Sequence, residues 1–147
     1  MITVKNLLDN KGYDVFSIHP EATVFEALQY MAEKGVGAIP IIKDGNMVGI
    51  FSERDYVRKL VKIKDFSDKS KVSDFMTHHV VTVRPYSDVM VCMILMTSMR
   101  IRHLPVIDDD KLIGMVSIGD VINSIVSMQK QTIKDLEGYI SGNYGVQ

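Results

Sequence analysis

The alternation of apolar and polar positions along the chain predicts the same series of short elements twice. In each half a lead-in is followed by a β-branched run typical of a strand, a helix-period pattern, two further strand-like runs and a second helix. The predicted segments are 4–8, 15–18, 24–34, 38–42, 47–51 and a helix from 53 in the first half, and 72–76, 80–83, 89–100, 103–107, 112–116 and a helix from 118 in the second. We therefore expect an α+β fold made of two similar halves.

Turn residues divide these segments. Asp44-Gly45 is a strong signal for a tight hairpin, and the run 108–111 predicts a second hairpin that turns less tightly. The charged segment 62–71 has no clear periodicity, so we interpret it as the linker between the halves.

The junction between the last strand and the last helix of each half carries a shared motif. Residues 114–120 read Gly-Met-Val-Ser-Ile-Gly-Asp, and residues 49–55 read Gly-Ile-Phe-Ser-Glu-Arg-Asp. Serine followed three residues later by aspartate has the spacing of a capping box, with aspartate in place of glutamate or glutamine. The same groups suit a nucleotide, because helix N–H groups attract phosphate and a carboxylate accepts hydrogen bonds from ribose. For a single copy, capping alone is the simpler interpretation.

An offset of 65 residues, the separation of Asp55 from Asp120, aligns the two halves without a gap. It matches prolines, a turn residue and the junction motifs, pairing Pro20 with Pro85, Pro40 with Pro105 and Asp44 with Asp109. This agreement indicates a duplicated unit. We divide the chain into a first repeat, 1–65, a second repeat, 66–128, and a C-terminal extension, 129–147.

Length and charge limit the functions open to the chain. Its 147 residues can bury a core but are few for two ordinary independent domains, so two intertwined halves fit the size. A formal net charge of −1 provides no general attraction to nucleic acid or to an anionic membrane, and the apolar run 89–99 is too short to span a bilayer. The N-terminus lacks the features of a signal peptide. With Cys92 as its one cysteine, we expect a cytoplasmic protein with a buried structural thiol.

The tandem β-α-β-β-α units, each with an early strand proline and a Gly-x-x-Ser-x-x-Asp junction, closely resemble a CBS-domain pair, or Bateman module, from Val4 to Val126. The resemblance implies two repeats packed sheet to sheet about a pseudo-two-fold axis, with two clefts that bind AMP, ATP, NAD(H) or another adenosine ligand. It implies ribose at Asp55 and Asp120 and phosphate or ribose near Ser52 and Ser117. It also implies adenine between the end of one strand and the start of the next, at Ser17, Ile18, Ile39 and Pro40 or at Thr82, Val83, Leu104 and Pro105.

The two copies differ in charge beside these sites. Arg102 and His103 stand where the first half has Gly37 and Ala38, and a guanidinium can grip two phosphate oxygens. Arg54 stands in the first turn of a predicted helix, a position that indicates a nearby anion. The candidate ligand-binding residues are Ser17, Ile18, Gly37, Ala38, Ile39, Pro40, Ser52, Glu53, Arg54 and Asp55 for the first site, and Thr82, Val83, Ile101, Arg102, His103, Leu104, Pro105, Ser117, Ile118, Gly119 and Asp120 for the second.

From these differences we expect the second site to be the better site for a nucleoside monophosphate, and the first to bind more weakly or to accept a larger ligand. The alternative for Arg100 and Arg102 is a solvated helix end beside the acidic run 108–110.

Catalytic and metal-binding motifs are missing from the pattern. The sequence has no Gly-x-x-x-x-Gly-Lys loop, nucleophile elbow or paired carboxylates, so we expect no enzyme activity and no catalytic cofactor. The adjacent histidines 78 and 79 point apart in a regular element, and no ligand cluster accompanies them, so we expect no metal.

The helix from 118 has helix-spaced apolar positions well beyond the repeat, and we expect it to end near Glu137 because Gly138 follows, with a loose tail from Tyr139 to Gln147. An apolar stripe with nothing left to cover predicts a two-fold homodimer. We expect a stand-alone regulatory module that binds an adenine nucleotide and acts through its homodimer on an unknown protein. Three alternatives remain. One is a structural dimer with empty clefts, and another is an enzyme that converts adenine nucleotides. The third is a nucleic-acid-binding protein that uses Arg54, Arg58, Lys59, Lys62 and Lys64.

Overall fold

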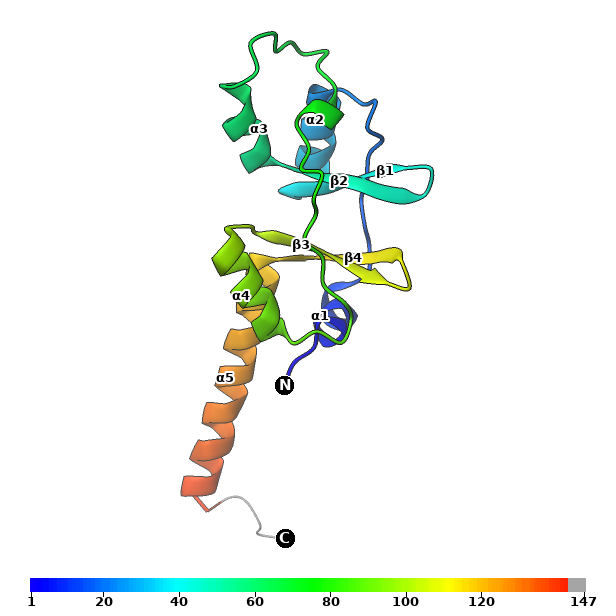
Figure 1. Cartoon of the computed structure of the whole chain (residues 1–147). Helices are drawn as coiled ribbons and strands as arrows, with labels where there is room; N and C mark the ends of the chain where they lie inside the picture. Colours follow the sequence, from blue (N-terminus) through cyan, green and yellow to red (C-terminus); the bar gives the residue numbers. More distant parts are fainter. Residues whose placement is uncertain (143–147) are drawn as a thin grey trace.

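The computed structural model describes residues 1–142, which form two halves stacked one above the other with their β-hairpins facing each other (Figure 1). The first half contains α1 (Val4–Lys11), α2 (Val24–Lys34), β1 (Ala38–Lys43), β2 (Asn46–Ser52) and α3 (Glu53–Leu60). The second contains the 3-10 turn η1 (Val72–Asp74), α4 (Val89–Met99), β3 (His103–Asp108), β4 (Lys111–Ser117) and α5 (Ile118–Ile140). The α+β class and the duplicated order of elements are confirmed.

Each half is built on one antiparallel hairpin, β1 with β2 and β3 with β4. Both turns hold two residues, Asp44 and Gly45 in the first and Asp109 and Asp110 in the second, and all four have positive φ between 47° and 80°. Positive φ at both central residues is the type I′ geometry that matches the strand twist. The second hairpin is as tight as the first, so the prediction of a looser turn was wrong. Aspartate tolerates the left-handed region well enough to replace glycine there.

The outer strands predicted at 15–18 and 80–83 do not form. Each run contributes a single parallel bridge, Ile18 with Ile41 and Val83 with Val106. Pairing goes no further because the next two residues include Pro20 or Pro85, and proline has no N–H group to continue the ladder.

The two lead-in segments are exchanged between the halves. α1 packs its buried Val4, Leu7 and Leu8 into the core of the second half, around α4, β3 and β4. Residues 72–76 likewise complete the core of the first half, where Phe75 is fully buried. The backbone follows the same exchange, since Val4 N donates to the Ser87 carbonyl at 2.8 Å. We call α1 and residues 72–76 the exchanged lead-ins.

The helix α5 extends well beyond the body of the molecule (Figure 1). It continues through Gly138 to Ile140, so the prediction that it ends near Glu137 was wrong, and Tyr139 is helical. A glycine inside a helix costs only about 1 kcal/mol relative to alanine, which one position can bear. The left-handed glycine that follows the helix is Gly142, with φ 75°. The remainder of the predicted loose tail, 143–147, lies outside the described residues.

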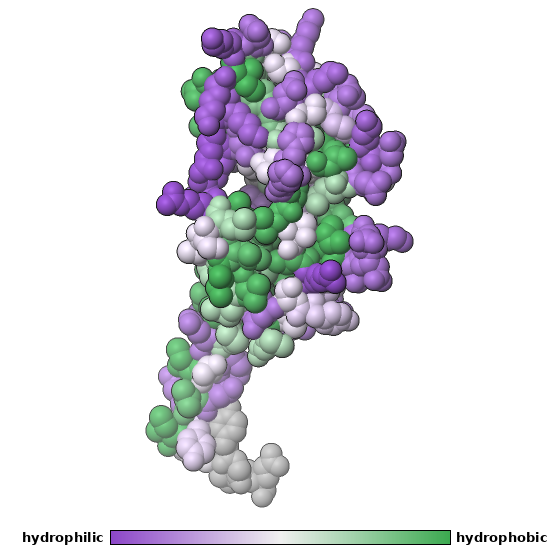
Figure 2. Space-filling view, in the orientation of Figure 1, coloured by the Kyte–Doolittle hydropathy of each residue, from purple (hydrophilic) through white to green (hydrophobic). Residues whose placement is uncertain are grey.

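Exposed apolar side chains gather over α4 and along one side of α5 (Figure 2). They include Met90, Val91, Ile94 and Met99 of α4, and Ile122, Val126, Ile133 and Leu136 of α5. We call these residues the α4–α5 apolar face. Within residues 1–142, no helix is long and apolar enough to cross a membrane.

Candidate nucleotide site

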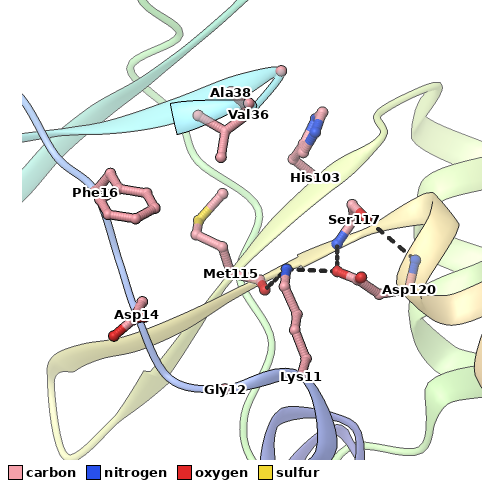
Figure 3. Close-up of a pocket in the computed structure, with 12 residues that line it drawn as sticks. Lys11, Gly12, Asp14, Phe16, Val36, Ala38, His103, Met115, Ser117 and Asp120 are labelled. Atoms are coloured by element: carbon pink, nitrogen blue, oxygen red, sulfur yellow. Dashed lines mark hydrogen bonds and ion pairs between the residues drawn. The ribbon is translucent and has the colours of Figure 1, made fainter. Parts of the chain in front are cut away.

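Two pockets lie between the facing hairpins, and we name each by its aspartate. The Asp120 pocket has a volume of about 450 Å³ and is shown in Figure 3. It is lined by Lys11, Gly12, Asp14, Phe16, Gly35, Val36, Gly37, Ala38, His103, Met115, Ser117 and Asp120. The Asp55 pocket has a volume of about 170 Å³ and is lined by Gly37, Ala38, Ile50, Ser52, Glu53, Arg54, Asp55, Arg58, Thr77, His79, Val80, Val81, Arg100, Ile101, Arg102 and His103.

The two pockets are related by the 65-residue repeat. Ser117 and Asp120 in one correspond to Ser52 and Asp55 in the other, and the segment 35–38 corresponds to 100–103. Each pocket therefore combines the serine–aspartate junction of one half with the start of the first hairpin strand of the other half. A molecule bound in either pocket must contact both repeats.

The capping boxes form as predicted at both junctions. The Ser117 side chain accepts a hydrogen bond from Asp120 N at 3.2 Å, and Asp120 Oδ2 accepts one from Ser117 N at 2.8 Å. Ser52 and Asp55 repeat both bonds, at 3.1 and 3.2 Å. Capping uses one carboxylate oxygen of each aspartate. It therefore fixes the direction of the carboxylate and leaves its second oxygen for another contact.

Lys11, at the end of α1, closes one side of the Asp120 pocket (Figure 3). Its Nζ atom donates to Asp120 Oδ2 at 2.6 Å and to the Met115 carbonyl at 2.8 Å. Burial alone would raise the pKa of Asp120, but hydrogen bonds from Lys11 and from Ser117 outweigh it and hold this pKa below its usual value. Asp120 is therefore ionised at neutral pH and ready to accept hydrogen bonds.

Thr77 has the same place in the Asp55 pocket. Its N–H donates to the Ile50 carbonyl at 2.8 Å, and its hydroxyl donates to Asp55 Oδ1 at 3.2 Å. Ile50 corresponds to Met115 in the repeat, so one lysine side chain in one pocket replaces the backbone and hydroxyl contacts of a threonine in the other. Lys11 belongs to one exchanged lead-in, and Thr77 directly follows the other.

Apolar side chains form the wall opposite Asp120. In Figure 3, Phe16 and Val36 lie across the cavity from Ser117 and Asp120, with Met115 between them. An aromatic ring and aliphatic side chains on the side of the cavity opposite a fixed carboxylate suit a ligand with a flat apolar part and a polar part.

His103 lies between the two pockets and lines both. Burial, followed by the charge of Lys11, lowers its pKa, so the imidazole is neutral at pH 7. A Cβ atom added at Gly37 would lie 3.3 Å from His103 Cε1, so the His103 imidazole lies close against the Gly37 backbone at this wall. A ligand in one pocket that moves this shared wall therefore changes the shape of the other pocket.

Four arginines surround the Asp55 pocket, namely Arg54, Arg58, Arg100 and Arg102. Arg54 donates to the Arg100 carbonyl at 3.4 Å. The charge of Arg58, then partial desolvation and the charge of Arg102, lower the pKa of Arg54. Within residues 1–142, the ion pairs join lysines to carboxylates, so none of these guanidiniums is paired with an acidic side chain.

The structure groups the predicted site residues differently from the sequence. Arg102, predicted beside Asp120, lies in the Asp55 pocket with Arg54, because each strand start faces the junction of the opposite half. His103 is the predicted second-site residue that contacts both pockets. The predicted residues that line a pocket are Gly37, Ala38, Ser52, Glu53, Arg54, Asp55, Ile101, Arg102, His103, Ser117 and Asp120.

The segments predicted to flank adenine are hydrogen-bonded to each other. Ile18 N donates directly to the Pro40 carbonyl at 3.1 Å, and Val83 N donates to the Pro105 carbonyl at 3.0 Å, so each pair of segments is joined by backbone hydrogen bonds. The predicted residues that line neither pocket are Ser17, Ile18, Ile39, Pro40, Thr82, Val83, Leu104, Pro105, Ile118 and Gly119.

Sequence reasoning missed Lys11, Asp14, Phe16 and Met115, and also Thr77 with its neighbours His79 and Val81. The repeat offset relates Phe16 to Val81 and Asp14 to His79, so the aligned halves held a signal for these positions. Lys11 had no such signal. Within residues 1–142, no group of three or more His, Cys, Asp or Glu side chains is placed to hold a metal ion.

A model of the CBS domain matches residues 2–62 and 72–127. The chain belongs to the CBS-domain family. The mitochondrial CBS domain-containing protein CBSX3 of Arabidopsis thaliana is 42% identical over 127 residues, which cover 83% of this chain and 62% of that protein. The present CBS pair thus spans less than two thirds of that relative.

Solved structures agree with this assignment. The crystal structure of a CBS-domain containing protein from Agrobacterium tumefaciens is 37% identical, with a TM-score of 0.80 over 84% of this chain and 98% of that one. The crystal structure of CBSX2 in complex with AMP is 28% identical, with a TM-score of 0.69 over 88% and 99% of the two chains. The predicted tandem CBS pair is confirmed.

Proposed function

We propose that this CBS pair is a regulatory sensor that binds an adenosine-containing ligand, of the AMP, ATP or NAD(H) type, in the pockets between its repeats. The observation that carries the proposal is the composite construction of both pockets, each lined by residues from both halves. A ligand there changes the relative free energies of different arrangements of the halves, which is the requirement for a ligand to act as a signal. The AMP complex of the related CBSX2 supports the ligand class.

Asp55 and Asp120 are the proposed ribose ligands. Capping fixes each carboxylate, and Asp120 Oδ1 accepts no hydrogen bond from residues 1–142, so it is free to accept one from a ribose hydroxyl. The apolar wall formed by Phe16, Val36 and Met115 is the proposed contact for adenine in the Asp120 pocket. Ser52 and Ser117 lie at helix N-termini, where N–H groups favour the oxygens of the sugar or phosphate.

The signal is proposed to leave through a homodimer. The α4–α5 apolar face exposes large side chains such as Ile94, which is 62% exposed, and Leu136, which is 56% exposed. α5 begins at the capping box that contains Asp120, so a ligand at Asp120 contacts the first turn of the helix that carries this face. A monomeric protein rarely exposes so continuous an apolar surface. We expect Ile94→Glu to give a monomer in light scattering, with the exposed Lys64→Glu as the dimeric control.

Thermal unfolding tests the ligand proposal directly. The purified protein is heated alone and with AMP, ATP, NAD, NADH or S-adenosylmethionine at millimolar concentration. A ligand present at a hundred times its dissociation constant adds about 2.7 kcal/mol to the free energy of unfolding, which is roughly 5–10 °C in Tm for a chain of this size. The shift should disappear in the double variant Asp55→Asn and Asp120→Asn, which keeps side chains capable of capping.

The outcomes separate the alternatives. If no compound shifts Tm, the chain is better described as a structural dimer. If it binds RNA or DNA with an affinity that falls steeply with salt, the nucleic-acid alternative gains support. We expect no turnover of any of these nucleotides, because the sequence has no Gly-x-x-x-x-Gly-Lys loop or nucleophile elbow. The buried Cys92 suits a reducing compartment, and we propose a cytoplasmic location.

A further inference from the structure

The two pockets are copies of one site, yet they differ in charge at every position where the Asp55 pocket carries an arginine. Arg100 and Arg102 precede β3, and the repeat offset places Gly35 and Gly37 at the same positions before β1. The arginines line the Asp55 pocket, and the glycines line the Asp120 pocket. One pocket therefore has two forked cations where the other has bare backbone.

The helix at each junction shows the same difference. Arg54 and Arg58 lie one turn apart on α3, and their counterparts on α5 are Gly119 and Asn123. The charge of Arg54 faces Arg58 and Arg102, the charge of Asp55 offsets them only in part, and no ion pair among the described residues includes Arg54. Like charges held together destabilise the empty pocket, and an anion would relieve that cost.

The Asp55 pocket also contains the carboxylates of Glu53 and Asp55, which its four arginines outnumber. The Asp120 pocket has the opposite balance, with two carboxylates and one lysine. Its lysine, Lys11, is held by Asp120 Oδ2 at 2.6 Å and by a backbone carbonyl, so its charge is already neutralised. Asp14 adds a second carboxylate, at the position where the Asp55 pocket has His79. His103, shared by both pockets, is uncharged at neutral pH. A phosphate placed in this pocket would meet the carboxylate of Asp14 and the Lys11–Asp120 ion pair, and no further cation from the described residues.

We propose that the two pockets divide adenosine ligands by charge. The Asp55 pocket takes a ligand with a 5′-phosphate, and the Asp120 pocket takes an adenosine ligand whose 5′ substituent carries no negative charge. The proposal rests on the proposed function, since it assumes that both pockets bind adenosine. The protein would then sense two classes of adenosine compound at the same time, and both ligands would contact the shared wall that contains His103.

Isothermal titration with two probes tests this division. AMP carries the phosphate, and 5′-methylthioadenosine is an uncharged relative. Asp55→Asn should abolish AMP binding and leave 5′-methylthioadenosine binding intact, and Asp120→Asn should do the reverse. The double variant Arg54→Gly and Arg102→Gly, which copies the other repeat, should weaken AMP binding about a hundredfold, because each of the two charge-assisted contacts contributes about tenfold. Arg84→Gly, an exposed arginine outside both pockets, is the matched control.

A gain-of-function variant tests whether an added arginine gives the Asp120 pocket affinity for AMP. A Cβ atom added at Gly119 would have its nearest neighbour, Ser117 Oγ, at 3.6 Å, an ordinary contact, so Gly119→Arg should fold. This variant copies Arg54 into the Asp120 pocket. We expect it to acquire a second AMP site that is lost when Asp120→Asn is added.

The possible results distinguish failure of the division by charge from failure of the proposed function. If neither probe nor any compound of the thermal panel binds the wild-type protein, the proposed function fails and the division fails with it. If both probes compete for one pocket, or if the arginine variant weakens both equally, the pockets bind adenosine but do not sort it by charge. AMP binding that depends on Asp120 rather than Asp55 would also overturn the division.

Discussion

The exchange of the lead-ins can be tested with one buried leucine and the chain's single thiol. By sequence Leu8 belongs to the first repeat, but it is fully buried in the core of the second half, which also contains Cys92. Phe75 belongs by sequence to the second repeat and is fully buried in the core of the first. Removing either side chain should therefore loosen the half to which it does not belong by sequence.

The magnitude for Leu8→Ala follows from its surroundings. Truncating a buried leucine costs about 2–5 kcal/mol, and the cost is larger where the surroundings cannot collapse into the cavity. On one side Leu8 packs against the β4 backbone at Gly114, where an added Cβ atom would lie 2.8 Å from a leucine methyl. A strand backbone cannot fill the gap, so we expect a loss of about 4 kcal/mol and a fall in Tm of roughly 8–16 °C.

Thiol labelling shows which half opens. Burial raises the pKa of Cys92 to about 11, so at pH 8 the native thiol reacts slowly with a disulfide reagent such as DTNB. Leu8→Ala should label Cys92 much faster than global unfolding of this variant would allow, because the second half opens locally. Phe75→Ala, compared at an equal free energy of unfolding, should label no faster than global unfolding allows. Asn10→Ala, at an exposed position of α1, is the control. Faster labelling in Phe75→Ala than in Leu8→Ala would refute the exchange.

Three further changes have expected outcomes. Lys11→Met should cost at most about 1 kcal/mol at pH 7, because the ion pair with Asp120 is partly exposed, and it should reduce the acid sensitivity of stability. The reason is that the pKa of Asp120 is lower in the folded protein than the usual carboxylate value near 3.8, so its ionised form stabilises the fold above that pH. This contribution is lost as the pH falls through the pKa of Asp120 in the folded protein, and urea titrations at several pH values would show the loss. Asp110→Gly should raise Tm by a few degrees, since it removes a non-glycine residue with φ 63°, and an unchanged or lower Tm would contradict this. Gly49→Ala should destabilise more than its repeat counterpart Gly114→Ala in denaturant unfolding, because the added Cβ atom would lie 2.9 Å from a backbone carbonyl oxygen and not only near a flexible side chain.

Local features of the fold could be predicted from the sequence, because local interactions decide them. The serine–aspartate spacing identified the capping boxes, and the tight Asp44-Gly45 turn followed from its dipeptide. The second turn was misjudged because aspartate at φ 63° replaces the expected glycine. Gly138 was misjudged because a glycine late in a helix has no fixed effect on where the helix ends.

The site could be predicted only in part, because its assembly depends on how the halves meet. The two aspartates were identified, since the repeat marks them. The partner of each aspartate could not be read from its own repeat, because the facing hairpins bring Arg102 to Asp55 instead of Asp120. Lys11 was missed for a related reason. It reaches the pocket only because α1 packs in the second half, and the repeat contains no equivalent lysine.

The exchanged lead-ins also fix the order in which the chain can fold during its synthesis. The first core cannot close until Phe75 and Met76 have left the ribosome. α1, with only 8 residues, is too short to be stable alone and must wait for the β4 backbone at Gly114. At common rates of translation, this wait lasts roughly 5–20 s. The first segment to be made is thus among the last to reach its native place, and the nascent first repeat exposes an incomplete core until the second has emerged.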